Sequence, residues 1–443
     1  MSVFLNPTDK LLALAALWSE KPWTRPQPIG LIPSMGYGDR IGLATSGHIL
    51  AHKNSGLERK VAPIFAQQSA REMARTGRSP VDVMLDACRA LGESDYRGEV
   101  GADADHLKTR EQVRGCMEAG FTWFTADPSD EVDDEADNLS SAQVEQSFQK
   151  LRTEFPREFD HYIFDYAQIH SIEGVAEPIV AKAEEIERIA LKYGRALLRV
   201  RDIHDWITDG WRSDEPFDFE VSIDETSTHT TPLAHLLIIR ELKRLGIRIV
   251  ALAPRFVGEF QKGIDYIGDL EEFRQSLQVH VAIVRVEGPY KISVHSGSDK
   301  FSIYPILAEE CGGLLHLKTA GTSYLEGLRV IARKNPHLFR SVAKFSAGVF
   351  ENQRATYHLK ADLMNFPDPD KVPDSALEKA FLVSPGAADA RQILHVAFGS
   401  VLTDEGGQRF GEPMKGLLEK QNDEYADVLA VHFARHLGAF IPT

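Results

Sequence analysis

The sequence predicts an α/β fold: a (β/α)8 barrel of the TIM type with a helical insertion between strands 4 and 5 and a C-terminal helical extension. Three observations predict it. Eight short β-rich segments recur along the 443-residue chain, amphipathic helical patterns lie between several of them, and polar residues gather where the segments end. Barrels of this type carry their catalytic residues at the carboxyl ends of the strands, so these polar ends mark the expected site.

The predicted strands follow one another along the whole chain. In order they lie in IGLIPSMGYGD, VAPIFAQQS, YRGEVGADADH, FTWFTADPSD, FDFEVSIDETS, IRIVALAPRF, KISVHSGSD and GLLHLKTAGTS. Between them, PLAHLLIIRELKRLG and EGLRVIARK have apolar residues at three- and four-residue spacing, which is typical of amphipathic helices. The regular alternation favours a parallel barrel over an antiparallel sheet.

Two regions exceed a minimal barrel. Residues 131–215, which include AEPIVAKAEEIERIALKYG, predict a long and mostly helical insertion. The acidic run DPSDEVDDEAD lacks the glycine and the spacing of an EF-hand, so we interpret it as a solvated approach to a helix. We assign residues 1–340 to a catalytic barrel domain with its insertion, and residues 341–443 to a helical extension that acts as a cap or as a homo-oligomer contact.

Composition and charge exclude several classes of protein. The net charge of −15 argues against a nucleic-acid binder, which must neutralise phosphates. Three distant cysteines without a CxxC pair predict neither disulfides nor a thiolate metal site. The run LLALAALW follows Asp9 and lacks a cleavage site, so it predicts an amphipathic helix rather than a signal peptide, and no apolar stretch approaches the ~20 residues that span a bilayer. We expect a cytoplasmic protein without a membrane partner.

Nucleotide-binding and hydrolase motifs are absent from the sequence. The glycines of GYGDRIG lie at 36, 38 and 42, so the third is one position late for a dinucleotide fingerprint. Neither a GxxxxGK[ST] loop nor a GxSxG nucleophile elbow occurs. These absences argue against nicotinamide chemistry and against an α/β-hydrolase.

Three histidines at predicted strand ends indicate a divalent metal site. His106, His295 and His316 follow the third, seventh and eighth strands. A single histidine at a strand end is more often structural, but three in one barrel favour a shared cation that keeps positions open for substrate. Zinc, manganese, nickel or a similar ion would suit these ligands. His358, in ATYHLKAD, is left without an assigned role.

Acidic and basic residues beside these histidines suit acid–base chemistry on a polar ligand. Asp105 precedes His106 and is an acid/base candidate, although an aspartate there also suits a helix N-cap. Glu225 is the second candidate, with Asp224 as its substitute, because alternation along a strand sends these two carboxylates to opposite sides unless the strand ends there. A rim for an anion or a polyol is predicted from Arg255, Ser298, Asp299, Lys300 and Lys318.

The sequence resembles the tagaturonate/fructuronate epimerase family, also described as hexuronate C4-epimerases. The resemblance runs from about residue 28 to 335 through MGYGDRIGLATSGH, PIFAQQSAREMARTGRSP, GADADHLKT, SIDET, LAPRFVGEFQKGIDYIGDLEEF, VHSGSDKFSIYP and LHLKTAGTSYLE. It implies a metal-dependent sugar epimerase that acts on a 2-keto hexuronate. The Asp105–His106 pair also resembles the Asp-His pair of class II aldolases, in which the aspartate is the acid/base and the histidine binds the metal.

The chemistry of such an epimerisation agrees with a metal and two acid/base groups. C4 is not adjacent to the C2 ketone, so enolisation cannot invert it. Two routes remain, transient oxidation of C4 by a nicotinamide or cleavage and re-formation of the C3–C4 bond, and the absence of a nucleotide motif favours the second. Three alternatives stay open: a 4-epimerase of neutral ketohexoses such as fructose and tagatose, a class II aldolase-like lyase, and a non-catalytic sugar-binding protein.

Overall fold

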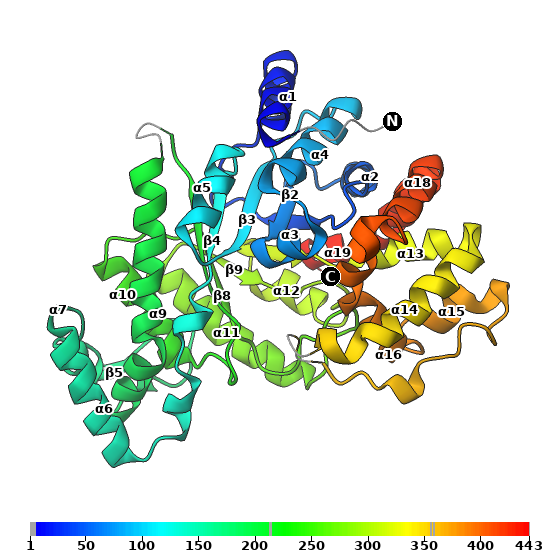
Figure 1. The fold of residues 1–443 in the computed structure, drawn as a ribbon. Coiled ribbons are helices and arrows are strands. Elements are labelled where there is room, and N and C mark those ends of the chain that lie inside the picture. Colours follow the sequence, from blue (N-terminus) through cyan, green and yellow to red (C-terminus); the bar gives the residue numbers. More distant parts are fainter. Residues whose placement is uncertain (1–5, 212–214, 355–356, 358, 443) are drawn as a thin grey trace.

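The computed structural model describes residues 6–211, 215–354, 357 and 359–442, and its centre is a closed barrel of eight parallel strands (Figure 1). Around the barrel the strands follow the order β1-β10-β9-β8-β7-β4-β3-β2. Their bounds are β1 Ser34–Gly38, β2 Ala62–Ser69, β3 Gly101–Leu107, β4 Trp123–Ala126, β7 Asp218–Ile223, β8 Ala251–Pro254, β9 Lys291–Val294 and β10 Leu315–Thr319. Each strand falls on one of the eight predicted segments, with β3 ending one residue beyond its segment, so the predicted (β/α)8 fold is confirmed.

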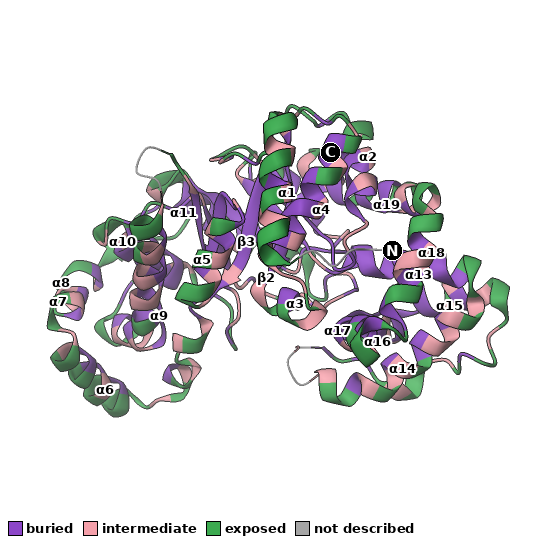
Figure 2. Ribbon diagram, turned by 45° about the horizontal axis from the view of Figure 1, so that its top comes forward, coloured by how far each residue is buried: buried purple, intermediate pink, exposed green. Residues whose placement is uncertain are grey.

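Helices surround the barrel and bury its strands from the outside. All residues of β1, β2 and β7 are buried, as expected for parallel strands covered on both faces. Figure 2 shows this contrast, with buried strands inside and exposed outer faces on helices such as α1 and α6. The surrounding helices are α1 Pro7–Glu20, α2 Thr45–Asn54, α3 Ala70–Thr76, α4 Pro80–Glu93, α5 Arg110–Glu118, α10 Pro232–Arg244, α11 Leu270–Glu287, α12 Tyr304–Glu310 and α13 Thr322–Lys334, with a 3-10 turn η1 at Pro22–Thr24.

Local sequence signals start the helices directly after the strands. The Thr231 hydroxyl accepts a hydrogen bond from the Ala234 amide, and Pro232 occupies the first turn of α10. Thr109 and Gln112 form a reciprocal capping box at the start of α5. Such caps satisfy amide groups that have no partner within the helix, so each helix begins close to the barrel rim.

The predicted insertion between the fourth and fifth barrel strands is present and mostly helical. It contains α6 Ser141–Glu154, α7 Pro156–Phe159, α8 Tyr162–Tyr166, α9 Ala183–Gly210, the 3-10 turns η2 Ser129–Glu131 and η3 Asp134–Asn138, and a small antiparallel pair, β5 Ile169–His170 and β6 Ile179–Val180. The acidic run forms η2 and η3, and its Asp134 and Asp137 pair with Lys192 of α9. This run therefore anchors the start of the insertion to α9 rather than remaining fully solvated.

The C-terminal helical extension packs on the barrel. It consists of α14 Pro336–Arg354, α15 Leu377–Leu382, α16 Ala388–Val396, α17 Phe398–Thr403, α18 Gly411–Lys420 and α19 Asn422–His436, with the 3-10 turns η4 Leu363–Asn365, η5 Asp374–Ala376, η6 Asp404–Gly407 and η7 Leu437–Phe440. A Cβ added to Gly47 of α2 would lie 2.6 Å from the Leu429 Cβ, so α2 and α19 approach closely. One hydrophobic core spans both parts, from Met35 to Phe433.

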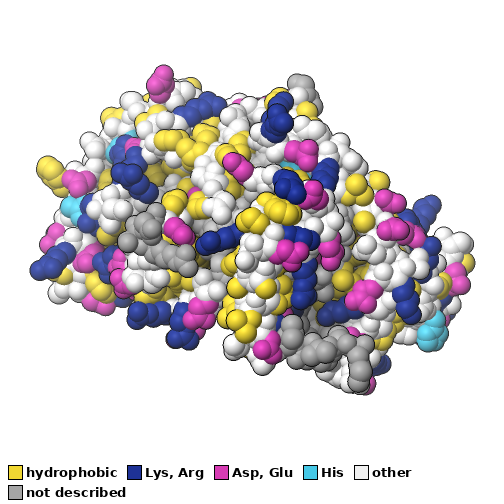
Figure 3. Space-filling view, turned by 90° about the horizontal axis from the view of Figure 1, so that it is seen from above, with side chains coloured by type: hydrophobic (Ala, Val, Ile, Leu, Met, Phe, Trp, Pro, Cys, Tyr) yellow, Lys and Arg dark blue, Asp and Glu magenta, His cyan; other side chains and the backbone are white. Residues whose placement is uncertain are grey.

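The surface carries both signs of charge. On the face shown in Figure 3, lysine and arginine side chains are interspersed with aspartate and glutamate rather than separated from them. In the described part of the chain, no helix combines the length and the apolar character needed to cross a bilayer. The described cysteines, Cys88, Cys116 and Cys311, are all buried and free.

Candidate active site

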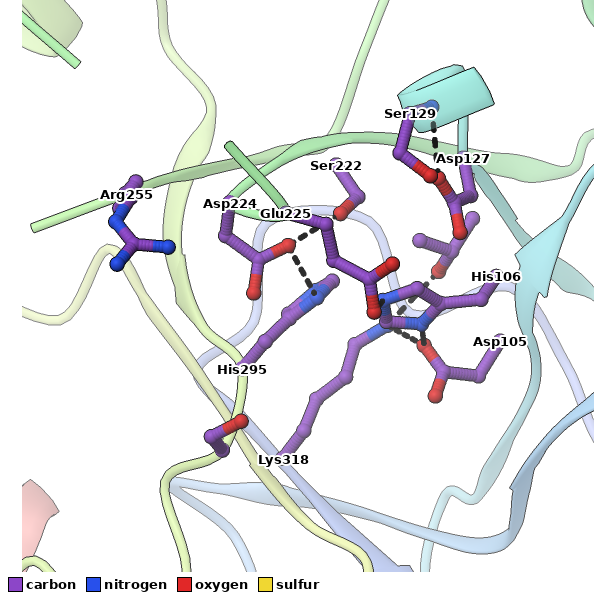
Figure 4. Close-up of polar contacts among 12 residues, drawn as sticks. Asp105, His106, Asp127, Ser129, Ser222, Asp224, Glu225, Arg255, His295 and Lys318 are labelled. Atoms are coloured by element: carbon purple, nitrogen blue, oxygen red, sulfur yellow. Dashed lines mark hydrogen bonds and ion pairs between the residues drawn. The ribbon is translucent and has the colours of Figure 1, made fainter. Parts of the chain in front are cut away.

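Two of the predicted histidines meet across the barrel axis. His106 is on β3 and His295 follows β9, and these strands lie on opposite sides of the barrel order. Their ring centroids are 4.8 Å apart. The His106 Nδ1 lies 2.7 Å from an Asp105 carboxylate oxygen (Figure 4), and the His295 Nε2 lies 2.7 Å from the Glu220 Oε1. Each imidazole is therefore oriented by a buried carboxylate.

A distortion of β3 aims His106 at this position. The register between β3 and β4 shifts between Ala104 and Leu107, which marks an irregularity in the ladder. His106 has a φ of 56°, in the left-handed region that non-glycine residues rarely adopt. Strained backbone of this kind persists where the surrounding structure holds it, and it is concentrated at functional sites.

A buried lysine contacts the carboxylates that hold the two imidazoles. The Lys318 Nζ lies 2.9 Å from an Asp103 oxygen, 2.7 Å from an Asp105 oxygen and 3.0 Å from a Glu220 oxygen. Burial lowers the pKa of Lys318, but the three carboxylates raise it by a larger amount. The net shift is upward, so the ammonium stays charged. This ion cluster fixes Asp105 and Glu220, which in turn hold the two histidines.

A cavity of about 870 Å³ opens beside His295 and is lined by Asp224 and Glu225. Because β7 ends at Ile223, strand alternation no longer sends the two carboxylates to opposite sides, and both reach the cavity. The Asp224 Oδ1 lies 3.4 Å from the His295 Nδ1, and the Glu225 Oε1 lies 4.0 Å from the His106 Nε2. The guanidinium of Arg71 pairs with Glu225 at 2.9 Å.

The donor atoms at this point fit a divalent cation. Ligand atoms of Asp105, His106 and His295 lie within 4.8 Å of one another, and so do those of His106, Asp127 and Glu225. Imidazole with carboxylate oxygen suits zinc, manganese or nickel. Burial lowers the pKa of His106, but Asp105 raises it more, to about 10, so a positive charge is favoured on this side chain. A bound cation would satisfy the same carboxylates.

His316 is not brought to this group. Its imidazole is fully buried, with the Trp123 ring centroid 4.7 Å away and its Nδ1 2.9 Å from the Ser34 hydroxyl oxygen. Its possible ligand partners among the described residues are Asp103 and Glu220. His316 and Lys318 are two residues apart on β10 and share one face, so Lys318 reaches the His106–His295 layer and His316 stays in the layer below. Of the three histidines that the sequence predicts as ligands, the structure therefore brings His106 and His295 together, beside carboxylates, and leaves His316 apart.

Most of the predicted basic rim has structural partners instead. The buried Lys300 ammonium donates to the carbonyl oxygens of Gln261, Ile264 and Ser298, at 2.8, 2.5 and 3.1 Å. Asp299 accepts an ion pair from Arg391 of the extension at 3.1 Å and lies 2.9 Å from the His432 Nε2. The Ser298–Lys300 turn therefore joins the barrel to neighbouring segments, because each of its polar groups is buried and must be paired.

Arg255 is the one predicted rim residue that lines the cavity. Its guanidinium donates to the Thr226 carbonyl oxygen, and Figure 4 shows it apart from the His106–His295 pair. Lys318, also predicted for this rim, is held in the ion cluster with Asp103, Asp105 and Glu220. His358 lies outside the described residues.

Three polar side chains of this region received no role from the sequence. Glu220 precedes the polar end of its strand and reads as a core position, yet it orients His295. Arg71 starts a helix, and Lys262 lies in the loop after β8, and both line the cavity. Both lie in stretches that carry the family resemblance, but their local sequence indicates no role, because a residue's place in a cavity depends on how distant segments fold over the barrel.

Known proteins match this chain over nearly its whole length. The family model described as tagaturonate epimerase matches residues 9–440. A tagaturonate/fructuronate epimerase from Thermotoga maritima is 41% identical over 416 residues, which cover 94% of this chain and 82% of that protein. The glycerol-complexed crystal structure of the fructuronate-tagaturonate epimerase from Cohnella laeviribosi superposes with a TM-score of 0.88 at 35% identity, covering 97% of this chain and 86% of that one. The native crystal structure of that enzyme gives the same values. The chain therefore belongs to the tagaturonate epimerase family and is an isomerase-class carbohydrate enzyme.

Proposed function

We propose that this chain interconverts tagaturonate and fructuronate by inverting C4, with a divalent cation held by His106 and His295. The observation that carries this proposal is the meeting of these two imidazoles across the barrel, 4.8 Å apart, beside a cavity lined by Asp224 and Glu225. The names of the relatives from Thermotoga maritima and Cohnella laeviribosi support the choice of substrate.

The position of C4 dictates the type of reaction. Its proton is not acidified by the C2 ketone, so a base cannot simply remove and return it. Cleavage of the C3–C4 bond avoids this difficulty: the C4 hydroxyl loses its proton, C4 becomes an aldehyde, and the bond electrons pass through C3 to the C2 oxygen. The products are a three-carbon enediolate and a three-carbon aldehyde acid. When the aldehyde turns over and the bond reforms, C4 has the opposite configuration.

The bound cation would act as a Lewis acid that stabilises negative charge on oxygen. The protein must then move a proton to and from the C4 oxygen. Glu225 is the proposed acid/base because its carboxylate lines the cavity and lies beside His106. Asp224, the adjacent carboxylate next to His295, is proposed as the second group that returns the proton after the aldehyde has turned.

Asp105, the acid/base candidate from the sequence, fits a positioning role better. Its Oδ1 lies 2.7 Å from both the His106 Nδ1 and the Lys318 Nζ, and its Oδ2 accepts from the Gln67 amide at 3.2 Å. A carboxylate so engaged is a poor proton carrier and a good support for a metal-binding histidine.

The test is an epimerisation assay with tagaturonate, fructuronate, tagatose and fructose. We expect uronate turnover that is lost on chelation and restored by Mn²⁺, Zn²⁺ or Ni²⁺. Full activity of the chelated enzyme would contradict the metal centre. Accumulation of free three-carbon products would favour an aldolase-like lyase, and binding of sugar without turnover would favour a sugar-binding protein.

A further inference from the structure

The cavity contains a lysine that has no role in the chemistry proposed above. Lys262 lies in the loop between β8 and α11 and lines the cavity together with His295 and Ser296. Its ammonium donates to the Ser296 hydroxyl oxygen at 2.6 Å. A lysine ammonium has three donors, so two of them are left for a ligand in the cavity.

The other cations along the cavity have protein partners of their own. Arg71 pairs with Glu225, Lys108 with Asp130, and Lys360 with Glu259, while Arg255 donates to the Thr226 carbonyl oxygen. Among the described lysines of this cavity, Lys262 is the one for which no carboxylate lies within ion-pair distance. Burial lowers its pKa, and Glu72 raises it by less, which indicates an ammonium that has lost water without gaining a counter-ion.

The loop that carries Lys262 is held in place from several sides. The Gln392 side-chain amide, from α16, donates to the Lys262 carbonyl oxygen at 3.2 Å. The neighbouring Gln261 accepts from the Lys360 amide at 3.1 Å through its side chain and from Lys300 at 2.8 Å through its carbonyl. A cation on such a loop is pre-organised, so little conformational entropy is lost when an anion binds.

Lys262 lines the same cavity as Glu225 and His295. Ser296, its partner, directly follows His295, so the ammonium lies next to the segment that carries the metal-binding imidazole. In a hexuronate the carboxylate carbon, C6, is two bonds from C4. A ligand with its C4 oxygen near Glu225 would therefore carry its negative charge into the same cavity wall.

We infer that Lys262 is a specificity-determining residue that binds the substrate carboxylate and makes the enzyme prefer hexuronates to neutral ketohexoses. This inference rests on the proposed function, because it assumes that a uronate occupies the cavity. It also assigns to Lys262 the role that the sequence suggested for Lys300 and Lys318, whose ammonium groups are held within the protein.

The test compares charged and neutral substrates in Lys262→Met and Lys262→Arg. We expect Lys262→Met to lower kcat/KM for tagaturonate about 10- to 100-fold, the usual effect of a lost charge-assisted hydrogen bond, with tagatose turnover unchanged. Lys262→Arg should recover part of the preference. Inhibition constants of glycerate and glycerol, a charged and a neutral three-carbon fragment, should show the same selective loss.

Lys360→Met is the matched control. This lysine lies at the same cavity, but its side chain is 75% exposed and its ammonium pairs with Glu259. Lys360→Met should keep the wild-type ratio of tagaturonate to tagatose turnover. An unchanged ratio and unchanged glycerate inhibition in Lys262→Met would overturn the inference, as would a selective loss in Arg255→Met instead. A wild-type enzyme without activity on either uronate would refute the proposed function itself.

Discussion

The imidazoles of His106 and His295 lie 4.8 Å apart, although their strands stand on opposite sides of the barrel. Each ring has a carboxylate behind it, Asp105 for His106 and Glu220 for His295. Both carboxylates contact Lys318. The two imidazoles and their supporting carboxylates thus form one connected unit, so substitutions at different depths of the barrel should have different and measurable effects.

Loss of either facing imidazole should abolish metal binding. We expect His106→Ala and His295→Ala to retain less than about a hundredth of the metal affinity and of the activity, since even the loss of a supporting group costs 10- to 100-fold. Metal content by mass spectrometry, read beside the circular dichroism spectrum, checks this. His316→Gln is the comparison, because this histidine lies in the layer below, and it should keep its metal. Normal metal content in His106→Ala would remove His106 from the ligand set.

Asp105→Asn should weaken metal binding without changing the acid–base behaviour of turnover. The amide cannot orient His106 as a carboxylate does, so we expect about a 10- to 100-fold lower metal affinity. With saturating metal, the pH profile of kcat should keep its wild-type form. A displaced acidic limb of that profile would instead make Asp105 a proton carrier.

Glu225→Gln should separate catalysis from metal binding. Removing a general acid/base typically lowers the rate about 10²- to 10⁴-fold, whereas His106 and His295 remain to hold the cation. The measurements are kcat for tagaturonate and metal content of the same preparation. Asp130→Asn serves as the control, because Asp130 lies at the same cavity but its side chain is 74% exposed. Unchanged kcat in Glu225→Gln would transfer the role to another group.

Lys318→Met should destabilise the barrel strongly. The substitution leaves Asp103, Asp105 and Glu220 buried without their shared counter-ion, and breaking a buried ion pair from one side costs about 3–5 kcal/mol. Denaturant unfolding or the Tm checks this. Lys371→Met is the exposed counterpart, with a side chain that is 84% exposed, and it should change the free energy of unfolding by less than about 1 kcal/mol. Equal stability of both variants would show that the Lys318 cluster is not a structural support.

Acidification should begin to destabilise the protein at pH values well above 4. Burial lowers the pKa of His48, His52 and His280 to about 4, whereas the unfolded imidazoles take up protons near pH 6.5. The unfolded state therefore binds more protons in this window, and each such histidine loses about 1.4 kcal/mol of stabilisation per pH unit below 6.5. The two histidines with a raised pKa, His106 and His295, oppose this trend. They are outnumbered, because burial also lowers the pKa of His204, His235, His316, His395 and His436.

The free energy of unfolding at pH 7.5 and pH 5.5 tests this expectation, with His52→Gln as the comparison. The variant should lose less stability between the two pH values than the wild-type protein. An equal or greater free energy of unfolding at pH 5.5 in the wild-type protein would contradict it.

The sequence alone determined the barrel, because that information is local. Alternation of β-rich and amphipathic segments, strand-end polar residues and helix caps such as Thr231 are all contained in short stretches of chain. It also determined that Asp105 and His106 adjoin on one strand and that two carboxylates follow β7, whereas the contact between Asp105 and His106 depends on the distortion of β3.

Only the tertiary structure decided which residues meet. Whether His316 or Lys318 reaches the layer of His106 depends on the stagger of β10 against the other strands, and strand stagger is a property of the closed barrel as a whole. The SGSDK turn is taken up by contacts to the extension and to the loop after β8, and Lys262 enters the cavity because distant segments hold its loop. Such contacts join residues far apart in the chain, and short-range patterns carry no information about them.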